Sequence, residues 1–305
     1  MSLPAQQLGV SADDYQQLKP ARVPQWLATL AIAATFCAAL YCSVIEQTLP
    51  DFAAWVASAC LLLALLSALL ITPRVFAVGF LLSLAPFLLA WRIAAINGAQ
   101  VLMCTAGIAV IVLVLQLADC IVTDCRRHRQ LPTGWLVTLL WQATVVRLCF
   151  GLNELCHSAE KIFAGLDSFH TLEKAFQGLG FNQYAAVFVV LGGLTELASA
   201  ISVGLGLFAR LGAAVSLVYF LVATVGFGGE WTRGYAWGTA GGGGWEYVML
   251  LLVVFGGVMM TGAGKFSLDG WLLQRTRLPG WMVGLCTRAQ SPNAFNVGQK
   301  DQVHS

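Results

Sequence analysis

The chain has few charged residues: Asp, Glu, Lys and Arg together make up 10% of its 305 residues. Soluble domains usually carry about 25% charged residues, so this shortage excludes an ordinary soluble domain. The basic residues also form no tract interleaved with aromatic side chains, the pattern that nucleic-acid grooves need. What the chain has instead is apolar, because 58% of its residues are hydrophobic. The composition therefore predicts an all-α polytopic membrane protein without a nucleic-acid partner.

The sequence also lacks the motifs that hold redox cofactors and metals. Its nine cysteines include no Cys-x-x-Cys pair, and most lie in apolar runs, where cysteine behaves as a small hydrophobic residue. Cys149 and Cys156 share a helix face but lie about 10.5 Å apart along the axis, too far for a disulfide. No haem, iron–sulfur or dinucleotide motif is present. We therefore expect no metal site and no covalently bound cofactor, so a redox role would need a quinone or a partner subunit.

Eight apolar runs are long enough to cross a bilayer, which takes roughly 20 helical residues. The predicted spans are residues 26–45, 52–71, 75–91, 101–122, 135–156, 184–208, 211–227 and 245–261. The third is short, contains Pro86 and ends at Trp91-Arg92, so we expect it to be tilted or kinked. Residues 1–25 are polar and unlike a cleavable signal peptide, so we expect a cytoplasmic tail and a retained first span.

A basic loop, residues 123–134, divides the spans into two sets of four. It follows a four-helix N-terminal membrane region (26–122) with few ionisable residues at membrane depth, which we interpret as a scaffold or a partner-docking unit. A C-terminal four-helix domain (135–275) and a cytoplasmic tail (276–305) follow. If the N-terminus is inside, the inside segments carry twelve Lys and Arg residues and the outside segments four. This excess predicts that both termini are cytoplasmic.

One otherwise apolar helix carries a stripe of ionisable residues. Arg147, Glu154 and Lys161 lie seven apart, and His157 falls between the last two. Positions i, i+7, i+10 and i+14 share one face of an α-helix. A charge in the bilayer is expensive, on the order of 2.5–3.5 kcal/mol for Arg at a helix centre. We therefore expect this face to meet polar partners on neighbouring helices.

Depth along the helices predicts the partner of Arg147. This residue lies about 18 Å from the inner end of its span, and Glu196 lies about 18 Å below the outer face. In a hydrocarbon layer about 30 Å thick, the two depths differ by about 6 Å, within the combined reach of both side chains. Because an unpaired buried charge costs far more than a paired one, we predict a structural ion pair between Arg147 and Glu196.

The rest of the stripe climbs towards the outer face, where Trp245 and Glu246 begin the last span. One hypothesis is that Glu154, His157 and Lys161 ring an outward-opening cleft together with Trp245 and Glu246. Such a cleft would bind a quinone or another small molecule, and Glu154 and His157 would handle protons. The other hypothesis is a polar network that only locks helix packing, because residues near the lipid boundary are solvated cheaply. Both alternatives stay open.

The longest outside loop, residues 158–183, has an amphipathic pattern. Its apolar residues recur at spacings of three or four and are Phe163, Leu166, Phe169, Leu172, Phe176 and Leu179. This stripe predicts a helix that lies in the outer membrane interface. A helix that only caps the bundle fits the pattern as well.

Three segments of the second half resemble the DoxX family. RLCFGLNELCHSAEKIFAGL (147–166) is similar to its first helix and exit loop, although many relatives have His-Gly where this chain has Cys-His-Ser. GFNQYAAVFVVLGGLTELASAISVGLGLFARLGA (180–213) is similar to its Gly-Leu-x-Glu helix and the turn that follows. WEYVMLLLVVFGGVMMTGAGKFSLDGWL (245–272) is similar to its last helix, whose Gly-x-Gly-[Arg/Lys]-[Tyr/Phe]-Ser-Leu-Asp ending is residues 262–269 here.

The resemblance implies a C-terminal four-helix membrane bundle linked to redox chemistry. Some relatives are quinone-linked subunits of thiosulfate oxidation, and others are partners of oxidative-stress proteins. The chain would then be a bacterial inner-membrane subunit or anchor of a quinone-linked redox system, in contact with lipid and redox partner subunits. Whether it would itself be an enzyme stays open. The alternative is a non-enzymatic membrane scaffold, or a transporter-like protein, although transporters typically pair broken helices across two halves.

Overall fold

The computed structural model describes residues 22–130, 134–228, 230–236, 244–276 and 278–286. All regular secondary structure in these residues is helical. Seven helices are long and apolar enough to cross a membrane, and an eighth apolar helix, α10 (Trp245–Thr261), has 17 residues. The prediction of an all-α polytopic membrane protein is confirmed, and each of the eight predicted spans corresponds to one of these helices.

The N-terminal region contains four long helices. They are α2 (Arg22–Val44), α3 (Asp51–Leu66), α4 (Phe76–Asn97) and α5 (Gln100–His128). A π-helical turn, Ser67–Ile71, extends α3. The third predicted span is longer than expected, because α4 continues through Pro86 to Gly98, whose left-handed conformation (φ 70°) ends the helix. The predicted basic linker also begins inside a helix, because α5 does not end until His128.

The C-terminal region contains the remaining membrane helices and several short ones. In chain order the α-helices are α6 (Gly134–Ser158), α7 (Leu166–Phe176), α8 (Ala185–Ser199), α9 (Ala209–Phe220), α10, α11 (Leu268–Arg275) and α12 (Gly280–Cys286), with short 3₁₀ helices at Asn182–Tyr184 and Glu230–Arg233. π-helical turns continue α6 to Phe163, α8 to Gly204 and α9 to Gly228. Lys161 therefore belongs to the continuation of α6, and α12 lies in a segment predicted to be only a tail.

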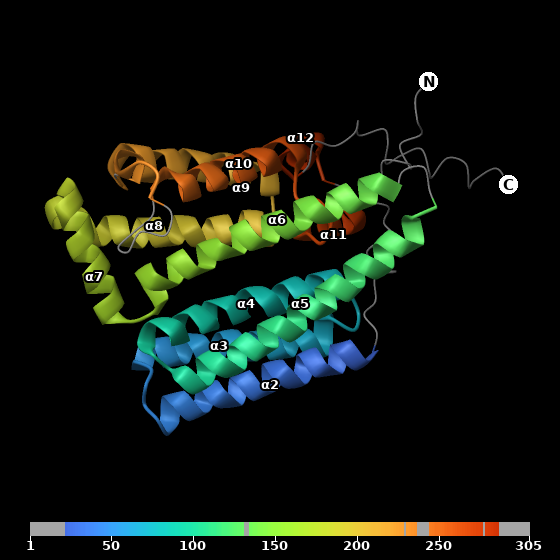
Figure 1. The fold of residues 1–305 in the computed structure, drawn as a ribbon, viewed down its shortest axis with the longest axis horizontal. Helices are drawn as coiled ribbons and strands as arrows, with labels where there is room; N and C mark the ends of the chain where they lie inside the picture. Colours follow the sequence, from blue (N-terminus) through green and yellow to red (C-terminus); the bar gives the residue numbers. More distant parts are fainter. Residues whose placement is uncertain (1–21, 131–133, 229, 237–243, 277, 287–305) are drawn as a thin grey trace.

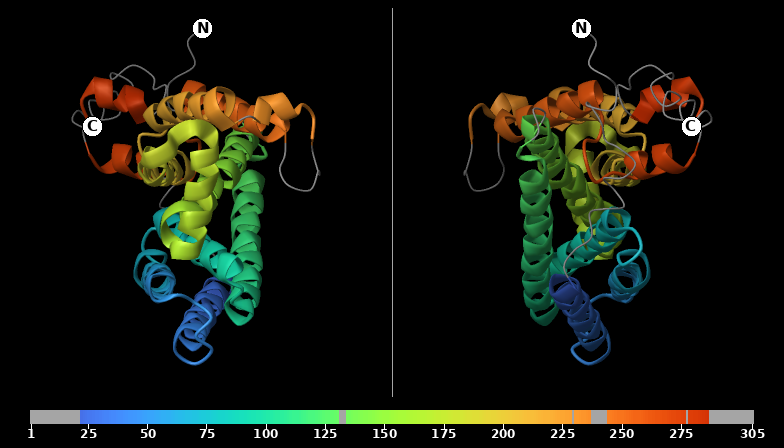
Figure 2. Two further views of the ribbon diagram at one scale, coloured as in Figure 1. Left: turned by 90° about the vertical axis from the view of Figure 1, so that its left-hand side faces the viewer. Right: turned by 90° about the vertical axis from the view of Figure 1, so that its right-hand side faces the viewer.

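The two sets of helices lie on opposite sides of the molecule and meet along α6 (Figures 1 and 2). In the N-terminal set α2 packs on α3 and α5, and α4 packs on α3 and α5. In the C-terminal set α6 packs on α8 and α10, and α9 packs on α8 and α10. Helices α4 and α5 contact α6 and join the two sets.

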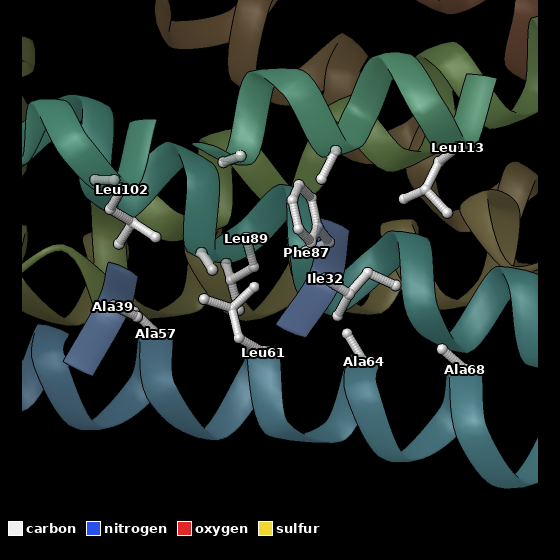
Figure 3. Close-up of a cluster of buried hydrophobic side chains, with 14 of the residues drawn as sticks. Ile32, Ala39, Ala57, Leu61, Ala64, Ala68, Phe87, Leu89, Leu102 and Leu113 are labelled. Carbon is white, nitrogen blue, oxygen red and sulfur yellow. The ribbon is translucent and has the colours of Figure 1, made fainter. Parts of the chain in front are cut away.

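Small side chains allow the N-terminal helices to pack closely. In Figure 3, Ala57, Ala64 and Ala68 of α3 and its extension point into a cluster that also holds Ile32 and Phe87. Membrane helices associate without a hydrophobic driving force between them, so small residues that let backbones approach are favoured at their contacts. This region therefore has a core in which alanines pack against large aliphatic and aromatic residues.

The two ends of the bundle differ. Helix α7 lies crosswise to the long helices at one end, called here the α7 end (Figure 1). The opposite end, called the α11 end, holds α11, α12 and the last turn of α5. The predicted amphipathic helix is therefore present across an end of the bundle, where its face with Phe169, Leu172 and Phe176 is half-buried.

Candidate functional site

A polar cluster lies near the α7 end, on three helices of the C-terminal region. The Nζ atom of Lys161 lies 2.8 Å from Oε1 of Glu196 on α8, and the Tyr219 hydroxyl of α9 donates to the same oxygen at 2.9 Å. Gly193 lets α8 approach Lys161 closely, because a Cβ there would lie 2.9 Å from the Lys161 Cβ. Lys161, Glu196, Tyr219 and the neighbouring Glu154 and Ser158 are called here the α7-end cluster.

Glu154 and Ser158 bring unpartnered oxygens to this cluster. They lie four residues apart on one face of α6, and the Glu154 side chain is only 1% exposed. Among the described residues, Oε1 of Glu154, Oγ of Ser158 and Oε2 of Glu196 have no hydrogen-bond partner. Glu154 lies within electrostatic range of both Lys161 and Glu196. One ammonium group therefore faces two carboxyl groups, and a neutral cluster would need one further proton.

The other predicted cleft residues lie on or beside α10. Asn153 of α6 donates to the Tyr247 hydroxyl, and the His157 ring centroid lies 6.2 Å from that of Tyr247. Trp245 stacks on Trp231 with ring centroids 6.5 Å apart. The structure thus brings Glu154 and Lys161 together, and places His157 against the first turn of α10.

Three of the five predicted cleft residues are buried, and the outward-opening cleft stays a prediction. The exposed fractions are 1% for Glu154, 8% for Glu246 and 11% for the Lys161 side chain, whereas His157 and Trp245 are half-buried. Two hollows in the described surface lie elsewhere, one over α7 and one between α3 and α4. The cluster is a buried polar site between helices.

The predicted ion pair between Arg147 and Glu196 is wrong. Arg147 donates from Nη1 to the carbonyls of Val203 (2.8 Å) and Gly204, and from Nη2 to the carbonyl of Phe266. It is therefore level with Gly204, eight residues beyond Glu196, or about 12 Å at 1.5 Å per residue. The guanidinium caps the last carbonyls of a helix, which lack intrahelical partners and carry the negative end of the helix dipole.

A second buried charge cluster, which sequence reasoning missed, joins the two halves at the α11 end. Nζ of Lys265 lies 2.6 Å from Oδ2 of Asp124 on α5, and the Trp141 indole donates to the same oxygen at 2.6 Å. His128 lies 3.3 Å from the other carboxylate oxygen. The missed signal was the continuation of α5 beyond residue 122, which brings Asp124 level with the end of α10.

The residues that follow Lys265 also pack against neighbouring elements at the α11 end. Phe266 packs against Phe76 of α4 and Trp141 of α6, with ring centroids 5.4 Å and 4.9 Å apart. The Asp269 carboxylate accepts hydrogen bonds from the backbone N–H groups of Phe208 (2.7 Å) and Ala209 (2.9 Å). Asp269 therefore caps the start of α9.

The short helices at this end hold a buried acid beside a buried thiol. Burial raises the pKa of Asp269 above its usual value, against the lowering effect of its backbone hydrogen bonds. Burial and, to a smaller extent, the neighbouring Asp269 carboxyl together raise the pKa of the Cys286 thiol to about 12. Ser267 caps the start of α11, since its hydroxyl accepts a hydrogen bond from the N–H of Gly270 at 3.1 Å.

Comparison with known proteins places the α7-end cluster in a family domain. The family model for DoxX matches residues 143–229, a segment that contains all five members of the α7-end cluster. Asp124 and Lys265 lie outside the matched segment. No curated protein and no solved structure matches the chain. The C-terminal half of this multi-pass membrane protein therefore contains a segment that matches the DoxX family model.

Proposed function

We propose that the chain is an integral-membrane subunit or anchor of a quinone-linked redox system, and that the α7-end cluster binds the quinone head group. One observation carries this proposal: Glu154 Oε1, Ser158 Oγ and Glu196 Oε2 are buried without hydrogen-bond partners among the described residues. Most buried polar atoms in proteins have a partner, and an exception needs an explanation. A ligand with hydroxyl donors and carbonyl acceptors would satisfy all three.

The residues present fit a quinone or quinol head group. A quinone supplies two-electron, two-proton chemistry within the bilayer. The Glu154 carboxylate can accept a hydrogen bond from a hydroxyl group, and the Ser158 hydroxyl can donate to a carbonyl group. Lys161 and Tyr219 hold Glu196 in place through its other oxygen. Because one ammonium faces two carboxyl groups, the cluster has room for one more proton, which is the capacity a proton acceptor needs.

The proposal extends to partners and location. The resemblance to DoxX relatives supports redox partner subunits, acting on sulfur compounds or in oxidative stress, that would exchange electrons with the quinone. The same resemblance supports a bacterial inner membrane. The excess of twelve Lys and Arg residues over four supports an orientation with both termini in the cytoplasm. In that orientation the α7 end faces outwards.

A non-enzymatic membrane scaffold is the second candidate, and one observation favours it. The ion pair between Lys161 and Glu196, with its hydrogen bond from Tyr219, joins the α6 extension, α8 and α9. Such a network holds three helices in register whether or not a ligand binds. In that case the unpartnered oxygens would be served by water.

Two measurements on the purified protein test the proposal. The first identifies quinone and partner subunits that co-purify with the chain. The second measures binding of a short-chain quinol to the wild type, Glu154→Gln, His157→Ala and a matched control, Glu173→Gln, which alters a carboxylate on α7. We expect Glu154→Gln to weaken binding about tenfold, the value of one charge-assisted hydrogen bond, and Glu173→Gln to bind as the wild type does. Equal binding by folded wild type and Glu154→Gln would favour the scaffold.

A further inference from the structure

An apolar groove lies between α3 and α4, far from the α7-end cluster. Its walls are Leu63, Leu66, Ser67, Leu70 and Ile71 on α3 and its π-helical extension, and Leu82 and Pro86 on α4. Both helices are membrane spans, and Leu63, Leu66 and Leu70 are exposed on their outer surface. From Leu63 to Ile71 the groove follows the helix for about 12 Å.

Three local features shape this groove. The π-helical turn at Ser67–Ile71 widens α3 where α4 packs on it. Gly79 packs directly on Thr72, because a Cβ there would lie 2.3 Å from the Thr72 nitrogen, so the two helices touch at this end of the groove. Further along, Pro86 lies inside α4 and has no N–H to donate to the carbonyl of Leu82, which lines the groove.

A cation stands at the α11 end of the groove. Arg74 is exposed, three residues beyond Ile71, and its guanidinium folds back to donate to the carbonyl of Leu70, which is part of the groove wall. The neighbouring Phe76 contacts Phe266, which places Arg74 at the α11 end. Within the described ranges no carboxylate forms an ion pair with Arg74. A guanidinium has five N–H donors, so most remain available to a ligand.

We infer that this groove binds one anionic phospholipid, with an acyl chain between Leu66, Leu70 and Leu82 and its phosphate on Arg74. The groove is apolar and faces the membrane, so a lipid chain is the occupant that its surroundings supply. The unpaired guanidinium at its end adds charge complementarity to a phosphate, which Arg binds through paired N–H donors. An anionic head group gains more from this cation than a zwitterionic one, whose own ammonium opposes it.

Native mass spectrometry of the purified protein tests this site. The wild type in detergent is mixed with phosphatidylglycerol, or with phosphatidylcholine of the same chain length, before it is released from detergent in the mass spectrometer. The affinity for the first bound lipid is then measured. The variants are Arg74→Gln, a groove-filling Leu82→Trp, and Arg126→Gln as the matched control, because Arg126 is an exposed arginine at the same end on α5.

We expect the wild type and Arg126→Gln to bind one phosphatidylglycerol about tenfold more tightly than phosphatidylcholine. Arg74→Gln should bind both lipids equally, and Leu82→Trp should lose the tightly bound lipid of either kind. The inference is overturned if the wild type shows no preference, if Arg126→Gln loses as much as Arg74→Gln, or if Leu82→Trp binds as the wild type does. Leu82→Trp keeps the test decisive if Arg74→Gln does not fold.

Discussion

Two buried groups of charges differ in how completely their charges are paired: the α7-end cluster, and the cluster of Asp124, His128, Trp141 and Lys265, called here the α11-end cluster. At the α11 end, the Asp124 carboxylate meets Lys265, Trp141 and His128. At the α7 end, three oxygens of Glu154, Ser158 and Glu196 lack partners among the described residues. A satisfied network specifies and holds a fold, whereas an unsatisfied one has capacity for a ligand.

The largest effect is expected from breaking the α11-end cluster. Asp124→Asn leaves the Lys265 ammonium buried without a counter-charge, which costs about 3–5 kcal/mol of unfolding free energy. Asp119→Asn, on an exposed face of the same helix, should change it by less than about 0.5 kcal/mol. Denaturation in detergent measures the unfolding free energy of both variants. A double Asp124→Leu, Lys265→Met variant should recover most of the loss, and equal stability of the two Asn variants would contradict a structural role for the pair.

A smaller loss is expected at Arg147. Arg147→Lys keeps the charge, but one ammonium cannot serve the carbonyls of Val203, Gly204 and Phe266 from both sides. We expect about 2 kcal/mol of destabilisation from the carbonyls left unpaired. The exposed Arg126→Lys is the control for the same chemical change. A stable Arg147→Lys variant would show that these carbonyls find partners elsewhere.

The α7-end carboxyl groups should respond unequally. Glu196→Gln removes the counter-charge of Lys161 and weakens the hydrogen bond from Tyr219, which should cost about 1–2 kcal/mol. Glu154→Gln should leave stability within about 0.5 kcal/mol of the wild type, because Glu154 Oε1 has no partner to lose. Melting temperatures in detergent compare the two. Equal losses would mean that Glu154 is as tightly engaged as Glu196.

The smallest effect is a pH dependence at Asp269. Because burial raises its pKa in the fold, the protonated form is favoured there. Its contribution to stability is therefore complete below the usual value of 3.8 and is lost as the pH rises through the raised pKa. The stability advantage of the wild type over Asp269→Asn should be largest below pH 3.8 and should shrink as the pH rises through the raised pKa. An advantage that grows with pH would show that the backbone hydrogen bonds dominate over burial.

The sequence was sufficient for the membrane spans because hydrophobicity is a local property of each helix. It was insufficient for contacts that depend on how far one helix slides along another. Depths counted along straight helices predict that Arg147 meets Glu196, but α6 continues through a π-helical turn to Phe163, so Lys161 reaches Glu196 instead. A π-helical turn has no simple sequence signature, so this register could not be read from the chain.

The ion pair between Asp124 and Lys265, which joins the two halves, was missed for a related reason. Hydropathy ended the fourth span at residue 122, and Asp124 was therefore assigned to a loop, although α5 continues to His128. Lys265 follows the last predicted span, which ends at residue 261, but it is 3% exposed and faces Asp124. They meet because both α5 and the segment after α10 pack against α6, where Thr144 donates to the Lys265 carbonyl.

The most direct test of the difference between the clusters is the dissociation constant of a short-chain quinol, measured for wild type, Glu154→Gln and Arg147→Lys under conditions where each is folded. We predict that Glu154→Gln binds about tenfold more weakly with an unchanged melting temperature. Arg147→Lys should melt earlier but bind as the wild type does. Unchanged binding by Glu154→Gln, or weakened binding by Arg147→Lys alone, would contradict the assignment of the ligand site to the α7 end.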